Sequence, residues 1–390
     1  MGNLKTLLLF AGVVALGAVT AVPAAAGVVV YEEGDKKVEI GARLQLQYLS
    51  VDLSEGPTED EIFFRRLRPY IAGTVTKDWW GKFQFDLGKS IEGNEVAIKD
   101  AYVQYRGWEN LTLTIGNSKT PFSREALASS KRQQTVERGF VGDHNFGSPD
   151  RQLGLKLEGQ SESRKITWAA AFGGQHVDPD ARRIDFDTPV NNDSDWNQGL
   201  IVAARVDFHP RGFMKFDQGD FHSGKTLYNF SLAYFDWSND GDNNSYTDPT
   251  TGLNTSSSKA DLDASSGLEL SAGVRGHGFS ADVEYEAVTG DTVDATFTGG
   301  AFLNGSTQLD KYQIEAGYML PGDRVELAGK FQGLDADNYG TAWEATEVGL
   351  NYFWNQHKVK LQLTYRMGEN VFGVVGDDSD SVFLQWQFVF

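Results

Sequence analysis

The chain has 390 residues and a formal net charge of −19, with 35 Lys and Arg against 54 Asp and Glu. This acidic balance argues against a nucleic-acid partner, which requires a basic face. The absence of Cys excludes disulfide scaffolds, Cys-ligated zinc and thiol nucleophiles. Mean hydropathy is −0.37 and only one segment is long and apolar, which excludes a membrane protein built of helices. A large globular protein or a closed β-barrel remains.

The long apolar segment lies at the N-terminus. Lys5 precedes an apolar run from Leu7 to Val22, and Pro23 and several small residues follow it. This order of basic, apolar and small residues predicts a secretory signal peptide over residues 1–26, with the mature domain at 27–390. A retained membrane anchor is the alternative, but the apolar run is short and small residues follow it at once. The sequence therefore predicts an exported protein.

Most of the mature chain alternates between polar and apolar residues with a period of two. In Lys37–Val51, for example, Val38 and Ile40 share one face while Glu39 and Arg43 share the other. This period predicts strands with one apolar face, and no convincing helical period occurs. Similar runs are Phe83–Leu87, Leu111–Ile115, Leu153–Leu157, Leu200–Phe208, Tyr228–Tyr234, Leu268–Val274, Phe279–Ala287, Tyr312–Leu320, Val325–Phe331, Val348–Trp354, Val359–Met367 and Ser381–Phe390.

The number and spacing of these runs predict an all-β fold, a transmembrane antiparallel β-barrel of about 16 strands. Connections alternate in length, as such barrels require. Gly276–Gly278 and Pro321–Asp323 are tight turns, whereas Asn239–Ala264 and Gly290–Thr307 are long and polar. The short connections are expected to face the periplasm and the long ones the outside.

Aromatic residues near the strand ends predict the two girdles that lie at membrane interfaces. They are Trp79, Trp80, Trp108, Trp237, Tyr352, Trp354 and Trp386. A soluble β-sandwich is the alternative source of such aromatic content. The terminal run ends in Phe390 and resembles the signal that outer-membrane assembly machinery recognises. Together these features predict localisation in the bacterial outer membrane.

The polar faces of the predicted strands are more basic than the chain as a whole. Arg43, Arg66, Lys82 and Arg205 lie on these faces, whereas much of the acid lies in the long connections. Rings of Arg or Lys at a constriction favour the passage of anions. For any single residue, the alternative is a salt bridge that only holds the wall together.

Several motifs resemble the phosphate-selective porin family of the O and P type. They are Phe64–Pro69, Lys82–Asp86, Ile98–Val103 and Gly116–Phe122. The resemblance is best over roughly the first 120 mature residues. It implies a 16-stranded, usually trimeric outer-membrane porin whose third outer loop folds into the lumen and narrows it. Phosphate specificity is not universal in this family.

The segment 117–150 matches that inserted constriction loop. It is too long for a hairpin turn and less acidic than the other long connections. Basic groups focus their field on a passing anion, and Ser hydroxyls can replace part of its hydration shell. A local Ser turn or cap is the alternative for the two serines. The resemblance implies a selectivity region of Arg66, Arg68, Asp100, Lys119, Ser129, Ser130, Lys131 and Arg138.

The resulting functional prediction is an outer-membrane porin for passive diffusion of small anions, with phosphate as a candidate solute. The alternatives are a general or cation-preferring porin and, less favoured, an outer-membrane adhesin or barrel enzyme. The six His residues are scattered and no GxSxG motif occurs, so no enzyme, catalytic residue, cofactor or metal is expected. The expected partners are small anions, outer-membrane lipid and lipopolysaccharide, and two further copies in a homotrimer, with no nucleic acid.

Overall fold

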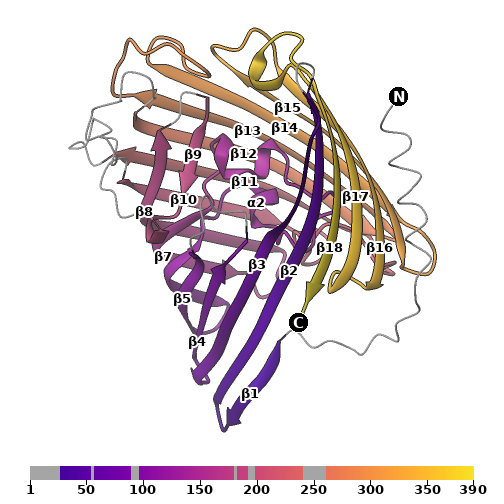
Figure 1. Ribbon diagram of the computed structural model, residues 1–390. Helices are drawn as coiled ribbons and strands as arrows, with labels where there is room; N and C mark the ends of the chain where they lie inside the picture. The colour runs from indigo at the N-terminus through magenta and orange to yellow at the C-terminus, as the bar shows by residue number, and fades with distance from the viewer. Residues whose placement is uncertain (1–26, 54–56, 89–95, 180–181, 192–197, 240–260) are drawn as a thin grey trace.

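The computed structural model describes residues 27–53, 57–88, 96–179, 182–191, 198–239 and 261–390. In these residues, sixteen antiparallel strands close into a barrel, because β18 pairs with β2 and β8 pairs with β10 (Figure 1). The predicted fold class and strand number are confirmed. The predicted signal peptide lies outside the described residues.

The barrel strands follow the predicted alternating runs and extend most of them. They are β2 (Lys36–Leu53), β3 (Glu59–Thr76), β4 (Trp79–Asp86), β5 (Ala97–Trp108), β6 (Leu111–Lys119), β7 (Arg151–Gln160), β8 (Ile166–Pro179), β10 (Gln198–Phe208), β11 (Leu227–Asn239), β12 (Leu262–Gly276), β13 (Phe279–Thr292), β14 (Ser306–Met319), β15 (Val325–Ala336), β16 (Trp343–Asn355), β17 (Val359–Glu369) and β18 (Ser379–Val389).

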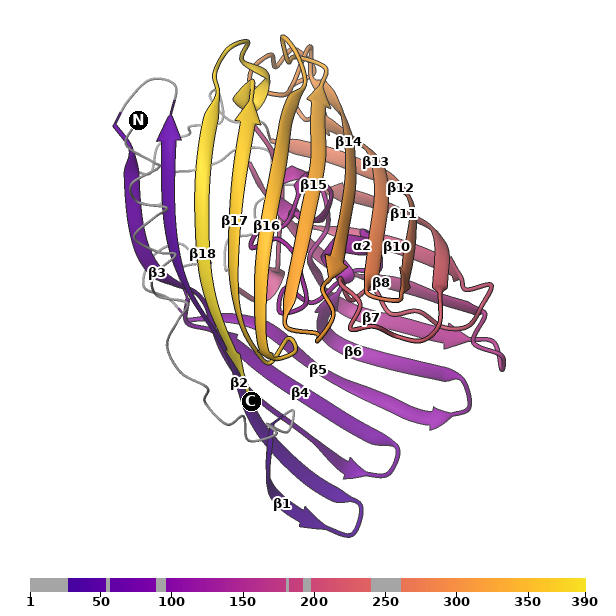
Figure 2. The ribbon, with the colours of Figure 1, turned by 90° about the vertical axis from the view of Figure 1, so that its right-hand side faces the viewer.

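Shorter elements lie beside or inside this barrel. β1 (Val28–Glu33) pairs with the start of β2, and β9 (Ile184–Asp187) pairs with the end of β8. One helical turn, α2 (Arg124–Leu127), lies inside the barrel in both ribbon views (Figures 1 and 2). The 3₁₀ turns are η2 (Phe140–Gly142), η3 (His144–Phe146), η4 (Pro189–Asn191) and η6 (Val371–Gly373).

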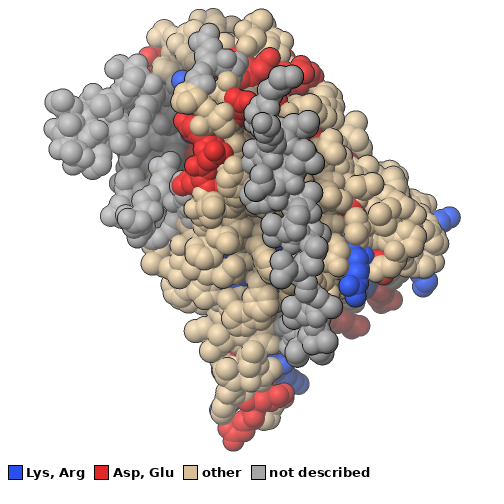
Figure 3. Space-filling view, turned by 45° about the vertical axis from the view of Figure 1, so that its right-hand side comes forward, with Lys and Arg blue, Asp and Glu red and all other residues tan. Residues whose placement is uncertain are grey.

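The outer face of the wall is apolar and exposed. In β10, Leu200 and Val202 are 54% and 53% exposed, whereas the intervening Ile201 is fully buried inside the barrel. A large continuous apolar surface of this kind is unfavourable in water and suits lipid. Figure 3 shows a mainly uncharged surface over the middle of the visible wall, with acidic residues near its upper end. No described helix is long and apolar enough to cross a membrane.

The predicted aromatic girdle is partly wrong. Trp79 and Trp108 are exposed on the outer face, and Trp354 stacks on Trp386 with ring centroids 5.6 Å apart. Trp237, in contrast, is fully buried inside the barrel, where its Nε1 donates to the Gln175 carbonyl oxygen at 3.1 Å. Trp80 lines the internal cavity described below. Neighbouring residues on a strand face opposite sides, so Trp79 and Trp80 cannot both contact lipid.

Part of the barrel interior is filled by an apolar core. The inward residues at one end of β10–β14 are apolar there, in contrast to the polar inner face that the alternation predicts. They pack against Phe122 and β9 in a single buried cluster. Segments that fold inward exclude water, so apolar side chains are stable at these lumen positions. The buried members are Phe122, Val177, Ile184, Phe186, Ile201, Ala203, Ala233, Phe235, Trp237, Leu262, Val288, Ala301, Phe302, Leu309 and Ala336.

The connection between β10 and β11, residues 209–226, is unexpectedly long for the end of the barrel at which it lies. It packs on a short turn of that end, where the Gly278 N–H donates to Asp220 Oδ2 at 2.8 Å. It also reaches into the lumen, because the backbone N–H of Gln218 donates to the Arg132 carbonyl oxygen at 3.1 Å. The predicted alternation of short and long connections is therefore wrong at this position. This inward connection contacts the constriction loop from the end of β10 and β11 opposite to the apolar core.

Candidate functional site

The connection from β6 to β7 is an internal loop, as the sequence predicts. The predicted loop began at residue 117, but β6 continues through Lys119, so the loop comprises residues 120–150. The β6–β7 pair holds this register through Lys119 and Arg151, which lie directly opposite each other. The loop carries α2 into the lumen (Figure 2).

The start of the loop is anchored on the inner face of β13 by Glu284. This buried carboxylate accepts from the Ser123 hydroxyl at 2.8 Å and from the backbone N–H groups of Arg124 and Glu125 at 2.7 and 3.0 Å. The Arg124 side chain adds an ion pair to Asp282, with Nε 2.7 Å from Oδ1. Buried charges are stable when they are paired and hydrogen-bonded, and Arg124 and Asp282 of this anchor meet both conditions.

A second anchor holds the middle of the loop against β16 and β17. Lys360 Nζ donates to the Gln133 carbonyl oxygen at 2.9 Å, and Asn351 donates to the Gln134 carbonyl oxygen at 2.8 Å. The inward connection contributes from the other side, because Gln218 Oε1 accepts from the Gln134 N–H at 2.8 Å. The loop therefore lies along the β13–β17 side and leaves the space beside β2–β7 open.

That open space is a cavity of about 1290 Å³ with a strongly positive lining. Twelve Lys and Arg residues line it against seven Asp and Glu, although the whole chain carries a net charge of −19. The basic residues are Lys37, Arg43, Arg65, Arg66, Arg68, Lys82, Lys99, Lys119, Lys131, Arg138, Arg151 and Arg183. The acidic residues are Glu39, Asp100, Glu137, Asp143, Asp150, Asp185 and Asp187.

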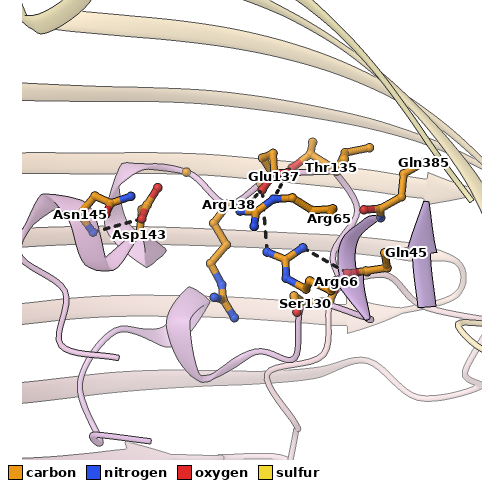
Figure 4. A network of polar contacts seen from close by, with 12 residues as sticks. Gln45, Arg65, Arg66, Ser130, Thr135, Glu137, Arg138, Asp143, Asn145 and Gln385 are labelled. Atoms are coloured by element: carbon orange, nitrogen blue, oxygen red, sulfur yellow. Dashed lines mark hydrogen bonds and ion pairs between the residues drawn. The ribbon is translucent and has the colours of Figure 1, made fainter. Parts of the chain in front are cut away.

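All eight residues of the predicted selectivity region line this cavity. Four come from wall strands and four from the loop. Figure 4 shows Arg65 and Arg66 directed at Glu137, with Arg66 also reaching Gln45. Ser130 Oγ accepts from Arg43 Nη1 at 2.5 Å. The Ser130 hydroxyl therefore bridges loop and wall, and does not cap a local turn.

Two of the predicted cations also stabilise the loop. Lys119 Nζ donates to the carbonyl oxygens of Ala126, Leu127 and Ala128, and Arg138 donates to those of Ala126 and Ala128. Carbonyl groups at the end of a helical turn lack helical partners and carry partial negative charge. Lys119 is thus a structural clamp as well as a lining residue, which the sequence did not reveal.

Arg68 and Asp100 take part in ion pairs of the wall. Arg68 Nε lies 2.6 Å from Asp86 Oδ2, and Asp100 lies between Lys82 and Arg151 at 2.5 and 3.0 Å. The contacts of these two residues therefore agree with the alternative that they form salt bridges which stabilise the wall. Their charges are largely compensated by the partners.

Six lining cations have no carboxylate within ion-pair distance among the described residues. They are Lys37, Arg43, Lys99, Lys119, Lys131 and Arg138. The sequence pattern places Arg43 on the polar face of its strand. The predicted selectivity region does not include Arg43, Lys99 or Arg151. In the sequence, these residues follow the same polar and apolar alternation as the other residues that face the lumen. Only the position of the constriction loop shows that they line the cavity.

The ionisation of two loop residues follows from their neighbours. Burial raises the pKa of the Glu137 carboxyl, but Arg65 and Arg66 outweigh it and hold the pKa at about 2. Burial, reinforced by Arg43 and Arg132, lowers the pKa of Lys131 to about 8. Glu137 therefore stays charged at neutral pH, whereas Lys131 loses its proton in mildly alkaline solution.

Ion selectivity is therefore expected to depend on pH. As the pH rises from 7 to 9, Lys131 becomes neutral and the cavity lining loses one positive charge. In water, one charge about 6 Å from a passing ion contributes about 0.7 kcal/mol to their interaction energy. The anion-to-cation permeability ratio is therefore expected to fall about threefold. Reversal potentials under a KCl gradient at several pH values measure this ratio. Lys131→Gln reduces the pH dependence and leaves the part due to His144. Burial lowers the pKa of His144, but Asp185 outweighs burial and raises the pKa to about 9. A wild-type ratio that is constant from pH 7 to 9 contradicts the assignment.

Among the described residues, no group of three or more His, Asp or Glu is arranged to hold a metal ion. The arrangement supplies a cavity with an excess of fixed positive charge beside a loop that is anchored at several points.

A family model described as phosphate-selective porin O and P matches residues 38–190. This segment includes β2–β8, the constriction loop and all eight predicted site residues. A search of curated proteins gave no match.

Solved structures share the whole barrel at low sequence identity. OmpT, an outer membrane protein of Vibrio cholerae in its trimer form, superposes with a TM-score of 0.58 at 12% identity, covering 91% of this chain and 99% of that chain. An anion-selective porin from Comamonas acidovorans superposes with a TM-score of 0.59 at 11% identity, covering 91% of this chain and 100% of that chain. Salmonella typhi OmpF, in a complex with daunomycin, superposes with a TM-score of 0.59 at 12% identity, covering 93% of this chain and 100% of that chain. The chain is therefore an outer-membrane β-barrel with the porin fold, and its predicted resemblance to the phosphate-selective porin O and P family is confirmed over residues 38–190.

Proposed function

We propose that the protein is a diffusion channel of the outer membrane that prefers small anions. The observation that carries this proposal is the excess of positive charge on the cavity lining, twelve basic residues against seven acidic ones. A low-dielectric wall focuses the field of such charges on a passing ion. The six cations without a carboxylate partner supply most of this uncompensated field.

The constriction loop makes the preference possible. It narrows the lumen to the space beside β2–β7, so that a permeating ion passes close to Arg43, Arg66 and Arg138. The numerous anchors to β13–β17 keep the loop in place while ions pass. The family match and the fold favour a channel rather than an enzyme.

Phosphate is the candidate solute, and support for it comes from the family match over residues 38–190. Arg and Lys side chains with a neighbouring Ser hydroxyl suit an oxyanion, because they can replace several of its water contacts. A homotrimer is supported by the same family and by the trimer form of the OmpT structure.

A general, cation-preferring porin is the second candidate. Asp143, Asp150, Asp185 and Asp187 line the same cavity and could attract cations at the entrance. Since ions must still pass the basic segment, we expect these acids to reduce the anion preference without reversing it.

The proposal is tested by single-channel recording of the purified protein in KCl, followed by titration with phosphate at constant ionic strength. We expect stable open-channel current that falls as millimolar phosphate occupies the cavity. A chloride current that phosphate does not reduce contradicts the phosphate assignment, and an absence of ion conduction contradicts the channel.

A further inference from the structure

Three aromatic side chains line the cavity among mainly polar residues. Tyr70, Trp80 and Tyr102 come from β3, β4 and β5, which are neighbours in the barrel (Figure 1). Each is only partly buried, so part of each ring remains accessible from the lumen. Exposed ring surface is unfavourable in a water-filled passage, and it therefore calls for an explanation.

The three rings are arranged with basic groups beside them. The ring centroids of Trp80 and Tyr102 lie 5.9 Å apart, and Tyr102 is directly opposite Lys82 in the β4–β5 pair. Lys82 Nζ lies 5.7 Å from the centroid of Tyr70, and the Arg106 guanidinium lies 4.4 Å from that of Trp80. Aromatic surface and positive charge thus alternate along this part of the wall.

The Tyr70 ring is held in a fixed orientation. Its hydroxyl donates to Glu39 Oε1 at 2.7 Å. The ring lies against the backbone of Gly41, where an added Cβ would approach its ring carbons to 2.5 Å. A residue with any side chain at position 41 would displace the ring. The platform is therefore built before a solute arrives, which lowers the entropic cost of binding.

We propose that Tyr70, Trp80 and Tyr102, with Lys82 and Arg106, form a subsite for small organic anions that carry a flat ring, such as aromatic carboxylates. This inference rests on the proposed anion channel and specifies a solute class for it. The ring of the solute stacks on the aromatic side chains, and its carboxylate pairs with the adjacent cations. The alternative is that the rings act only as cross-strand pairs that stabilise the wall.

The test compares two monoanions, benzoate and acetate, as blockers of the chloride current in planar bilayers. In the wild-type channel, benzoate is expected to halve the current at a concentration about two- to tenfold below that of acetate, the range for one aromatic contact. Trp80→Leu keeps an apolar side chain but removes the ring. In this variant, the half-blocking concentrations of benzoate and acetate are expected to become similar. Trp79→Ala is the matched control, because this neighbouring ring faces outward, and it leaves the ratio unchanged.

The proposal is overturned if the wild-type channel is anion-selective but is blocked equally by benzoate and acetate. It is also overturned if Trp80→Leu retains the wild-type ratio, since the rings then serve the wall alone. A cation-selective wild-type channel, seen in the reversal potential, instead contradicts the proposed function and the subsite with it.

Discussion

Replacing Arg43 by Glu is expected to lower the anion-to-cation permeability ratio about tenfold. The substitution changes the charge of the lining by two units, and two units at about 6 Å in water correspond to about 1.4 kcal/mol. The new carboxylate lies directly opposite Arg68 in the β2–β3 pair, which favours its accommodation. Reversal potentials under a KCl gradient measure the ratio, and Arg43→Gln is expected to give about half of the free-energy change.

The matched control for this experiment is Lys165→Glu. Lys165 is exposed between β7 and β8 and does not line the cavity, yet its substitution makes the same change in net charge. The control leaves the ratio close to wild type because exposed charges beyond a Debye length are screened. If both variants shift the ratio equally, the effect belongs to the total charge of the protein and not to the cavity.

Replacing Glu284 by Ala is expected to release the start of the constriction loop. The substitution removes the acceptor of the Ser123 hydroxyl and of two buried backbone N–H groups. Leaving buried donors unsatisfied costs about 2 kcal/mol, which raises the population of the detached loop about 30-fold. Cleavage by trypsin after Lys131 and Arg132 accelerates accordingly, and the open-channel current becomes noisier.

Glu344→Ala is the control for loop release. Glu344 also accepts a hydrogen bond, from the Tyr312 hydroxyl at 2.7 Å, but it makes no hydrogen bond or ion pair with the described residues of the loop. The control is expected to leave both the cleavage rate and the current noise unchanged. A Glu284→Ala variant with wild-type cleavage and current would show that the other anchors hold the loop without this carboxylate.

The barrel is predictable from the sequence because its signal is local. A strand between lipid and lumen needs apolar residues at every second position, and each run such as Leu200–Phe208 carries that period by itself. The constriction loop was predictable for a related reason. Its length and its basic residues depart from the other long connections, and the family motifs at Phe64–Pro69 and Gly116–Phe122 precede it.

The features that the sequence did not reveal depend on contacts between distant residues. The inward course of residues 209–226 rests on Gln218, whose partners Gln134 and Glu315 are 84 and 97 positions away. The apolar core around Trp237 is likewise assembled from β9 and the loop, so its inward orientation has no local signal. In the site, alternation placed Arg43 in the lumen, but only the position of Ser130 shows that it faces the constriction.

The most direct test of the anion preference is the reversal potential of the wild-type protein in a planar bilayer under a tenfold KCl gradient at pH 7. The excess of basic residues on the cavity lining predicts a potential of the sign set by chloride permeation. A potential of the opposite sign, set by potassium, would contradict the proposal and show that the acidic residues of the entrance outweigh the basic wall.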